Sequence, residues 1–256
     1  MLSITLFKAT APLDQPPLLI AHGLFGSGRN WGVIARRLAD TRDVITVDMR
    51  NHGESPRFPS QSYLEMAEDL AQVIVAQVGT ADVLGHSMGG KAAMVLALTQ
   101  GPLVRRLVVA DIAPVAYSHD QAQNIAAMAG LDLAGLTSRA EADQRLSETI
   151  DDPALRAFFL QSLDLRATPP RWRLNLLVLR DEAAKIVGWP GTGGQFTGRA
   201  LFLSGAQSSY VLPEHRAPIL AQFPNAYFAR IPGAGHWLHA EKPREFEETV
   251  RIFLNA

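Results

Sequence analysis

The hexapeptide Gly85-His86-Ser87-Met88-Gly89-Gly90 constrains the fold of this chain more than any other segment. It follows a short apolar run, Ala81 to Leu84, and precedes an alanine-rich helical pattern, Lys91 to Leu98. A G-x-S-x-G pentapeptide between a strand and a helix predicts a sharp turn with a strained, exposed serine. Its glycines are needed where a β-carbon would collide with neighbouring backbone. We therefore expect Ser87 to be a nucleophile, with the Met88 N–H as an oxyanion donor. The alternative is a glycine-rich turn whose serine is merely exposed to solvent.

Short apolar runs, typical of buried parallel strands, recur along the chain at 18–21, 44–47, 81–84, 107–110, 200–204 and 226–231. Helical patterns separate them at 30–39, 62–78, 91–98, 214–223 and 242–254, and residues 1–10 alternate like a further strand. Strands and helices that alternate in this way predict an α/β fold. We expect a mostly parallel central sheet with helices on both faces.

The alternation stops between residues 113 and 190. Helical patterns cover 121–129, 138–150 and 153–163, with a further stretch around 181–187, and no strong strand signal interrupts the first three. Glycine and threonine are frequent in 191–198, which predicts a hinge or return loop. We therefore expect a core domain made of residues 1–112 and 191–256, with residues 113–190 inserted as a helical cap over the site.

Composition excludes several classes of function. The 256 residues carry a formal net charge of -1 without charge runs, so we expect neither a nucleic-acid nor a membrane-surface partner. The absence of cysteine excludes disulfides and thiolate chemistry and suits a cytoplasmic location. The N-terminus lacks the features of a signal peptide, and no run of 18 apolar residues predicts a membrane span. No residue is assigned to a metal or cofactor, and the oligomeric state stays open.

A serine hydroxyl needs a general base within hydrogen-bond reach, and histidine suits this task at neutral pH. Among the seven histidines, His236 lies in the flexible segment Gly233 to Trp237, directly after the last expected strand. We expect His236 to be the base. The remaining histidines have structural interpretations at turns, beside the serine, or at surface and helix positions: His22, His52, His86, His119, His215 and His239.

The acid that orients the histidine must also stand at the carboxyl end of a strand. The loop after the expected strand 200–204 has no carboxylate, and Ser208 occupies the position where many proteins of this fold carry the acid. Asp111 ends the preceding strand at the same edge of the sheet. We favour Asp111, with Glu214 as the other candidate. Ser208 is expected to be a further hydrogen-bond partner of His236.

The second oxyanion donor should come from the loop after the first central strand, which reads His22-Gly23-Leu24-Phe25-Gly26. The Leu24 N–H is the favoured donor and the Phe25 N–H the alternative. The polar, turn-forming segment Asp48 to Ser55 is interpreted as structural, with its charges bracing the loop beside the oxyanion hole.

Together these residues resemble the α/β-hydrolase superfamily over essentially the whole chain. A narrower resemblance, to small bacterial YbfF-like esterases and mitochondrial abhydrolase-domain relatives, rests on further motifs: His22 to Ser27, Asn51 to Pro56, Gly85 to Lys91, Asp111 to Val115, Trp172 to Leu176 and Gly235 to Pro243. The resemblance implies Asp111 as the acid and Ser208 as a polar partner of His236. It also implies esterase or thioesterase activity on short acyl chains, with acyl-CoA thioesters among the substrates.

We therefore expect a serine hydrolase that acts on a small-molecule ester or thioester through an acyl-enzyme intermediate. The same constellation could perform C–C bond hydrolysis, perhydrolysis or an elimination of the menaquinone-pathway type. Dehalogenase and epoxide hydrolase chemistry is disfavoured because Ser87 stands where those reactions need a carboxylate. A non-catalytic binding module is the third alternative, and the serine, the histidine and both oxyanion turns argue against it.

Overall fold

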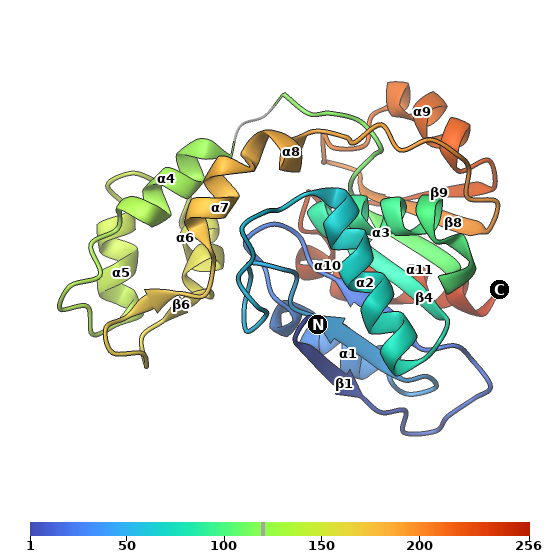
Figure 1. Ribbon diagram of the computed structural model, residues 1–256, viewed down its shortest axis with the longest axis horizontal. Helices are drawn as coiled ribbons and strands as arrows, with labels where there is room; N and C mark the ends of the chain where they lie inside the picture. Colours follow the sequence, from blue (N-terminus) through green and yellow to red (C-terminus); the bar gives the residue numbers. More distant parts are fainter. Residues whose placement is uncertain (119–120) are drawn as a thin grey trace.

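The computed structural model describes residues 1–118 and 121–256, and its centre is a seven-stranded sheet with the strand order β1-β3-β2-β4-β5-β8-β9 (Figure 1). The strands are β1 (Ile4–Phe7), β2 (Leu18–Ala21), β3 (Val44–Val47), β4 (Ala81–His86), β5 (Val104–Ala110), β8 (Arg199–Gly205) and β9 (Ala226–Ile231). Only the pairing of β1 with β3 is antiparallel among these seven strands, and the other pairs are parallel. The expected strands and the mostly parallel sheet are confirmed.

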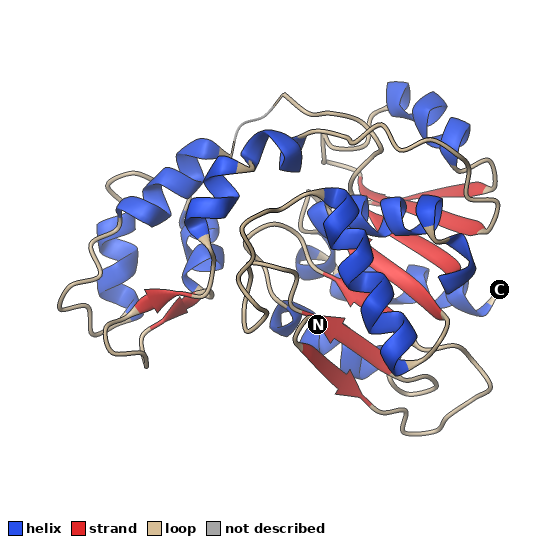
Figure 2. Ribbon diagram, in the orientation of Figure 1, coloured by secondary structure: helices blue, strands red, loops and turns tan. Residues whose placement is uncertain are grey.

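Helices cover both faces of the sheet, as the alternation predicted (Figure 2). One face is covered by α2 (Tyr63–Gln77), α3 (Met88–Thr99) and α9 (Arg216–Gln222), and the other by α1 (Gly32–Leu38), α10 (Leu238–Glu241) and α11 (Pro243–Asn255). Because successive side chains of a strand point to opposite faces, each strand contributes to both cores. In β2, for example, Leu19 belongs to the first core and Leu18 and Ile20 to the second.

Residues 113–190, here called the insertion, form a lobe beside the sheet (Figure 1). Its helices are α4 (Ala122–Gly130), α5 (Arg139–Leu146), α6 (Pro153–Leu160), α7 (Leu176–Asp181) and α8 (Ala183–Val187). It also contains an antiparallel two-stranded sheet of β6 (Leu163–Asp164) and β7 (Arg171–Trp172). Residues 191–198 form the expected return loop, without helix or strand.

Several expected helix boundaries differ from the structure. The predicted helix 30–39 begins as a 3-10 turn, Gly28–Trp31, before α1, and the predicted helix 214–223 likewise begins as a 3-10 turn, Pro213–His215, before α9. The predicted helix 153–163 ends at Leu160 because the chain turns there into β6. The two-residue strands β6 and β7 are too short to produce a periodic signal, so the sequence did not indicate them.

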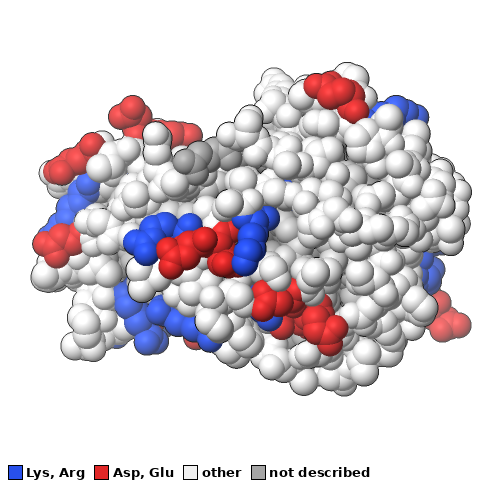
Figure 3. Space-filling view, turned by 45° about the horizontal axis from the view of Figure 1, so that its top comes forward, with Lys and Arg blue, Asp and Glu red and all other residues white. Residues whose placement is uncertain are grey.

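Charged side chains of both signs are interspersed on the face shown in Figure 3, in keeping with the net charge of -1. No helix in the two described ranges combines the length and apolar character needed to cross a bilayer.

Candidate active site

Ser87 lies in the sharp turn between β4 and α3, at φ 52° and ψ -119°. This conformation is strained for a residue with a side chain, and neighbouring backbone holds it in place. The Ser87 N–H donates to the carbonyl of Ala110 over 3.0 Å, and the Ser87 carbonyl accepts from the Lys91 N–H over 3.0 Å. A β-carbon at Gly89 would overlap the carbonyl oxygens of Ala21 and His22, which explains why this turn requires glycine.

The register of the sheet brings the end of β5 next to this turn. His86 pairs with Ala110 across β4 and β5, and Ala110 pairs with Leu203 across β5 and β8. Ser87 and Asp111 therefore follow adjacent strand ends at the same edge of the sheet. Asp111 also has a positive φ, 53°, in a conformation that aspartate tolerates better than most residues.

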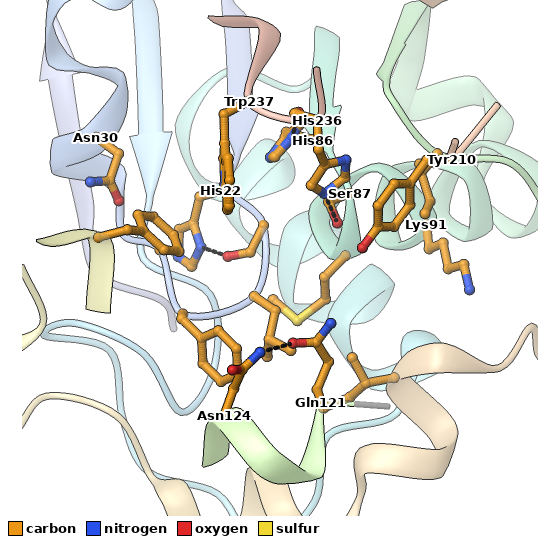
Figure 4. A pocket seen from close by; sticks show the side chains of 18 of the residues that line it. His22, Asn30, His86, Ser87, Lys91, Gln121, Asn124, Tyr210, His236 and Trp237 are labelled. Atoms are coloured by element: carbon orange, nitrogen blue, oxygen red, sulfur yellow. Dashed lines mark hydrogen bonds between the residues drawn. The ribbon is translucent and has the colours of Figure 1, made fainter. Parts of the chain in front are cut away.

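His236 bridges these two residues, and Figure 4 shows its contact with Ser87. Its Nε2 lies 3.1 Å from Ser87 Oγ, and its Nδ1 lies 2.7 Å from Asp111 Oδ2. Asp111 is fully buried, and its Oδ1 accepts the Gly205 N–H over 3.0 Å. The structure thus brings together the serine, histidine and aspartate that the sequence singled out.

Glu214, the other candidate for the acid, and Ser208, the expected partner of His236, lie as follows. Glu214 stands in the 3-10 turn before α9 and is exposed, whereas Asp111 contacts the imidazole. Ser208 was expected to hydrogen-bond His236, but its hydroxyl donates to Asp111 Oδ2 instead. The cause is the turn after β8, in which the Ser208 N–H bonds the Gly205 carbonyl over 3.2 Å and brings the hydroxyl to the carboxylate.

The loop after β2 contains both candidates for the second oxyanion donor, and their N–H groups differ in their hydrogen bonds. The Phe25 N–H donates to His52 Nε2 over 3.3 Å and is therefore occupied. The Leu24 N–H donates to no acceptor within residues 1–118 and 121–256. On the other side, the Met88 N–H precedes the first intrahelical bond of α3, which Lys91 donates. Leu24, Met88 and Ser87 all line one cavity.

Residues 16–243 match a protein family described as the alpha/beta hydrolase fold. The chain belongs to this family. Over 94% of its length the hydrolase is 40% identical to esterase YbfF of Escherichia coli (strain K12), of which it covers 94%. Over 99% of its length it is 40% identical to the Mus musculus sn-1-specific diacylglycerol lipase ABHD11, of which it covers 85%. The solved structure of a marine microorganism esterase superposes with a TM-score of 0.92 at 36% identity, covering 99% of this chain and 100% of that one.

These findings confirm the resemblance read from the motifs. Several curated relatives that match the hydrolase over nearly its whole length are named esterases or lipases. The hydrolase is accordingly an enzyme of the esterase and lipase type.

Neutral imidazoles surround the candidate base. His86 Nε2 lies 2.9 Å from the carbonyl of His236, so this nitrogen carries a hydrogen and donates it. Burial, together with the nearby imidazoles, lowers the pKa of His86 well below its usual range and that of His239 to about 3. Both neighbours of the candidate base are therefore uncharged at neutral pH.

Tyr210 is a contact that the sequence did not indicate. Its ring stacks on the imidazole of His236 with 3.7 Å between ring centroids and 16° between the planes. The stack limits the orientations open to His236, which keeps both ring nitrogens directed at their partners. One sequence contains no pattern that pairs a tyrosine after β8 with a histidine after β9.

The cavity beside Ser87 has a volume of about 300 Å³ and lies between the sheet and the insertion. Most of its lining is apolar and comes from both parts of the chain, including Leu24, Phe25, Met88, Phe158, Phe159 and Trp237. Gln121 and Asn124 face Ser87 from the opposite side, and Asn124 Nδ2 donates to Gln121 Oε1 over 3.1 Å (Figure 4). Such a site suits a small, largely apolar ligand with a few polar contacts.

Among the side chains that the structure describes, no group of three or more histidines and carboxylates could hold a metal ion. His119, one of the histidines interpreted as structural, lies outside the described residues.

Proposed function

We propose that the hydrolase cleaves short-chain carboxylic esters and thioesters, acyl-CoA thioesters among them, through Ser87, His236 and Asp111. The observation that carries the proposal is the position of His236 between Ser87 Oγ and Asp111 Oδ2, at 3.1 and 2.7 Å. These are the contacts that a general base needs to its nucleophile and to its orienting acid.

In this mechanism Ser87 Oγ attacks the carbonyl carbon while His236 Nε2 takes the hydroxyl proton. The N–H groups of Leu24 and Met88 stabilise the oxyanion that forms, and Asp111 stabilises the imidazolium. Collapse of the tetrahedral intermediate breaks the bond to the leaving oxygen or sulfur, which receives the proton from His236. Water then attacks the acyl-enzyme by the same steps and regenerates the Ser87 hydroxyl.

We further propose that residues 113–190 act as a cap on a core of residues 1–112 and 191–256. The cavity supports this division because its wall combines core residues with Phe158, Phe159 and Ile186 of the insertion. Its volume of about 300 Å³ is at the lower end of ligand pockets and supports short acyl chains.

The test compares the purified enzyme with its Ser87→Ala variant on p-nitrophenyl esters and CoA thioesters of increasing acyl length. We expect turnover to be highest for short chains, and Ser87→Ala to lower kcat by about 10⁴-fold or more, because the acyl-enzyme can no longer form. Ser147→Ala, at an exposed serine of the insertion, is the matched control and should leave kcat unchanged.

A fluorophosphonate probe gives an independent measurement. It should label the wild type at Ser87 and leave Ser87→Ala unlabelled. Full turnover by Ser87→Ala would refute the mechanism, and a wild type that neither labels nor turns over would indicate a binding module.

A further inference from the structure

Two motifs more than a hundred residues apart lie against each other: Asn51-His52 after β3, and Asn175 between β7 and α7. The backbone N–H of Asn175 donates to the carbonyl of Asn51 over 2.9 Å, and its Nδ2 donates to Asn51 Oδ1 over 3.0 Å. Asn175 of the insertion is therefore bonded to Asn51 of the core by both main chain and side chain, and its Nδ2 also donates to the Phe58 carbonyl over 3.3 Å.

Asn51 is a buried and fully bonded node. It is 1% exposed and has a φ of 64°, a left-handed conformation that asparagine tolerates. Its Nδ2 donates to the Ser60 carbonyl over 2.9 Å and to Gln61 Oε1 over 2.8 Å. Its Oδ1 accepts the Phe58 N–H over 2.8 Å in addition to the Asn175 amide. All four hydrogen-bonding positions of the side chain are occupied, which makes the node rigid.

The next residue, His52, connects this node to the oxyanion loop. Its Nδ1–H donates to the Arg50 carbonyl over 2.8 Å, so its Nε2 is the acceptor of the Phe25 N–H at 3.3 Å. Phe25 has a φ of 65°, and the bond to His52 holds this turn. Burial lowers the pKa of His52 to about 3, so the imidazole stays neutral and its Nε2 can accept.

A second set of contacts leads from Asn51 through Gln61 to Met88, the other candidate oxyanion donor. Gln61, which is fully buried, accepts from Asn51 and contacts the Met88 sulfur with its Nε2 over 3.6 Å. The insertion takes part in these contacts as well, because Glu182 Oε2 accepts the Gln61 N–H over 3.3 Å. Asn51, His52, Gln61 and Asn175 are absent from the cavity wall, so they act on the site through the residues that line it.

We propose that Asn51 and His52 are positioning residues for the oxyanion hole. Asn175 acts through its bonds to Asn51, so that the geometry of the oxyanion hole depends on how the insertion packs on the core. The inference rests on the proposed function, in which Leu24 and Met88 stabilise the oxyanion. Preorganised donors are effective only where their positions are held before charge develops. A neutral imidazole holds the Phe25 N–H, and a charge of the 48–55 segment, as the sequence led us to expect, holds the chain just after this loop, where Asp48 Oδ1 accepts the Gly28 N–H over 2.7 Å.

The test compares Asn175→Ala with Arg57→Ala. Arg57 Nη2 donates to the Trp172 carbonyl over 3.0 Å, so both variants remove a contact between core and insertion, but only Asn175 bonds Asn51. Each variant is assayed for kcat, KM, thermal stability and affinity for a trifluoromethyl ketone analogue of the preferred ester, which forms a tetrahedral adduct. We expect Asn175→Ala to lower kcat and analogue affinity together by about 10-fold, with KM nearly unchanged, and Arg57→Ala to leave kcat and analogue affinity unchanged.

The pair His52→Gln and His52→Leu tests the bond between the Phe25 N–H and His52. A glutamine oxygen can still accept the Phe25 N–H and a leucine cannot, so His52→Gln should recover at least 10-fold of the kcat lost in His52→Leu. Variants that lose thermal stability but bind the analogue as the wild type does would overturn the inference and leave the proposed function intact. A wild type that hydrolyses no ester and is not labelled at Ser87 would overturn both.

Discussion

The carboxylate of Asp111 accepts hydrogen bonds from the imidazole of His236, the backbone N–H of Gly205 and the hydroxyl of Ser208. Three donors converge on a side chain that solvent does not reach. This arrangement holds one carboxylate oxygen on the histidine and the other on the end of β8. A residue at a strand end can therefore orient a base that lies 125 positions later in the chain.

We predict that Asp111→Asn lowers kcat by about 10⁴-fold, because an amide that donates to Nδ1 favours the tautomer with its hydrogen on Nε2. Ser208→Ala removes one donor to the carboxylate and should have a smaller effect, within about 10-fold. Glu214→Gln is the matched control and should leave kcat unchanged, since Glu214 does not contact His236. Steady-state kinetics on a p-nitrophenyl ester measures all three. A Glu214→Gln variant as impaired as Asp111→Asn would show that the acid is misassigned.

At the scale of elements, α3 and α8 meet through one buried amine. Lys91 Nζ donates to the carbonyls of Val187 and Gly188 over 2.9 and 2.5 Å, at the end of α8. The ring of Tyr117 lies 4.8 Å from the amine, and Tyr63 of α2 donates its hydroxyl to Ile186 over 2.5 Å. The helix that follows Ser87, α3, and its neighbour α2 thus hold the segment by which the insertion returns to the sheet.

The pKa of Lys91 predicts how stability depends on pH. Burial lowers this pKa to about 7, although the two carbonyls and the tyrosine ring favour the ammonium. Between pH 7 and the ordinary lysine pKa the unfolded chain binds a proton that the native chain has lost, so the free energy of unfolding rises with pH. One such proton contributes about 1.4 kcal/mol per pH unit in the middle of that window.

We predict that Lys91→Met removes this rise, as measured by urea unfolding at pH 7.5, 8.5 and 9.5. Lys185→Met is the control, because Lys185 lies in α8, the helix whose end Lys91 contacts, but its side chain is 58% exposed beside Glu182. Lys91 is not the cause of the pH dependence if the free energy of unfolding rises with the same slope in the wild type and in Lys91→Met over these three pH values.

At the scale of the whole molecule, the edge of the sheet opposite to Ser87 carries a different kind of cluster. Near the start of β4, the fully buried Asp82 binds Arg42 Nη1 at 2.6 Å and Arg105 Nε at 2.7 Å. Both arginines also donate to the carbonyl of Leu254 in α11. This ionic cluster connects β4, β5 and the C-terminal helix at the edge remote from Ser87.

We predict that Asp82→Ala lowers the free energy of unfolding by about 3–5 kcal/mol, because it leaves the buried Arg42 without its carboxylate. The kcat of the folded fraction should stay unchanged. Lys8→Ala serves as the control, since it removes an exposed ion pair with Asp43 and should cost less than about 1 kcal/mol. Urea unfolding combined with active-site titration separates the two effects. A Lys8→Ala variant as destabilised as Asp82→Ala would contradict the assignment.

The order of strands and helices, the turn at Ser87 and the choice of His236 followed from the sequence because each depends on local requirements. Buried strands need apolar runs, a sharp turn against neighbouring backbone needs glycine, and a base must follow a strand that returns to the site. Conditions of this kind are visible within ten or so residues. The same local reasoning reduced the acid to Asp111 or Glu214 and the second donor to Leu24 or Phe25.

Only the tertiary structure shows which member of each pair has the contacts that the proposed role requires, because these contacts join residues far apart in the chain. The register of β4, β5 and β8 places Asp111 against His236, and His52 occupies the Phe25 N–H from 27 positions away. The stacking of Tyr210, the bond from Ser208 to Asp111, and the docking of Asn175 on Asn51 have the same origin. Local sequence determines which groups each strand end can offer, and hydrogen bonds between distant segments select which of them meet.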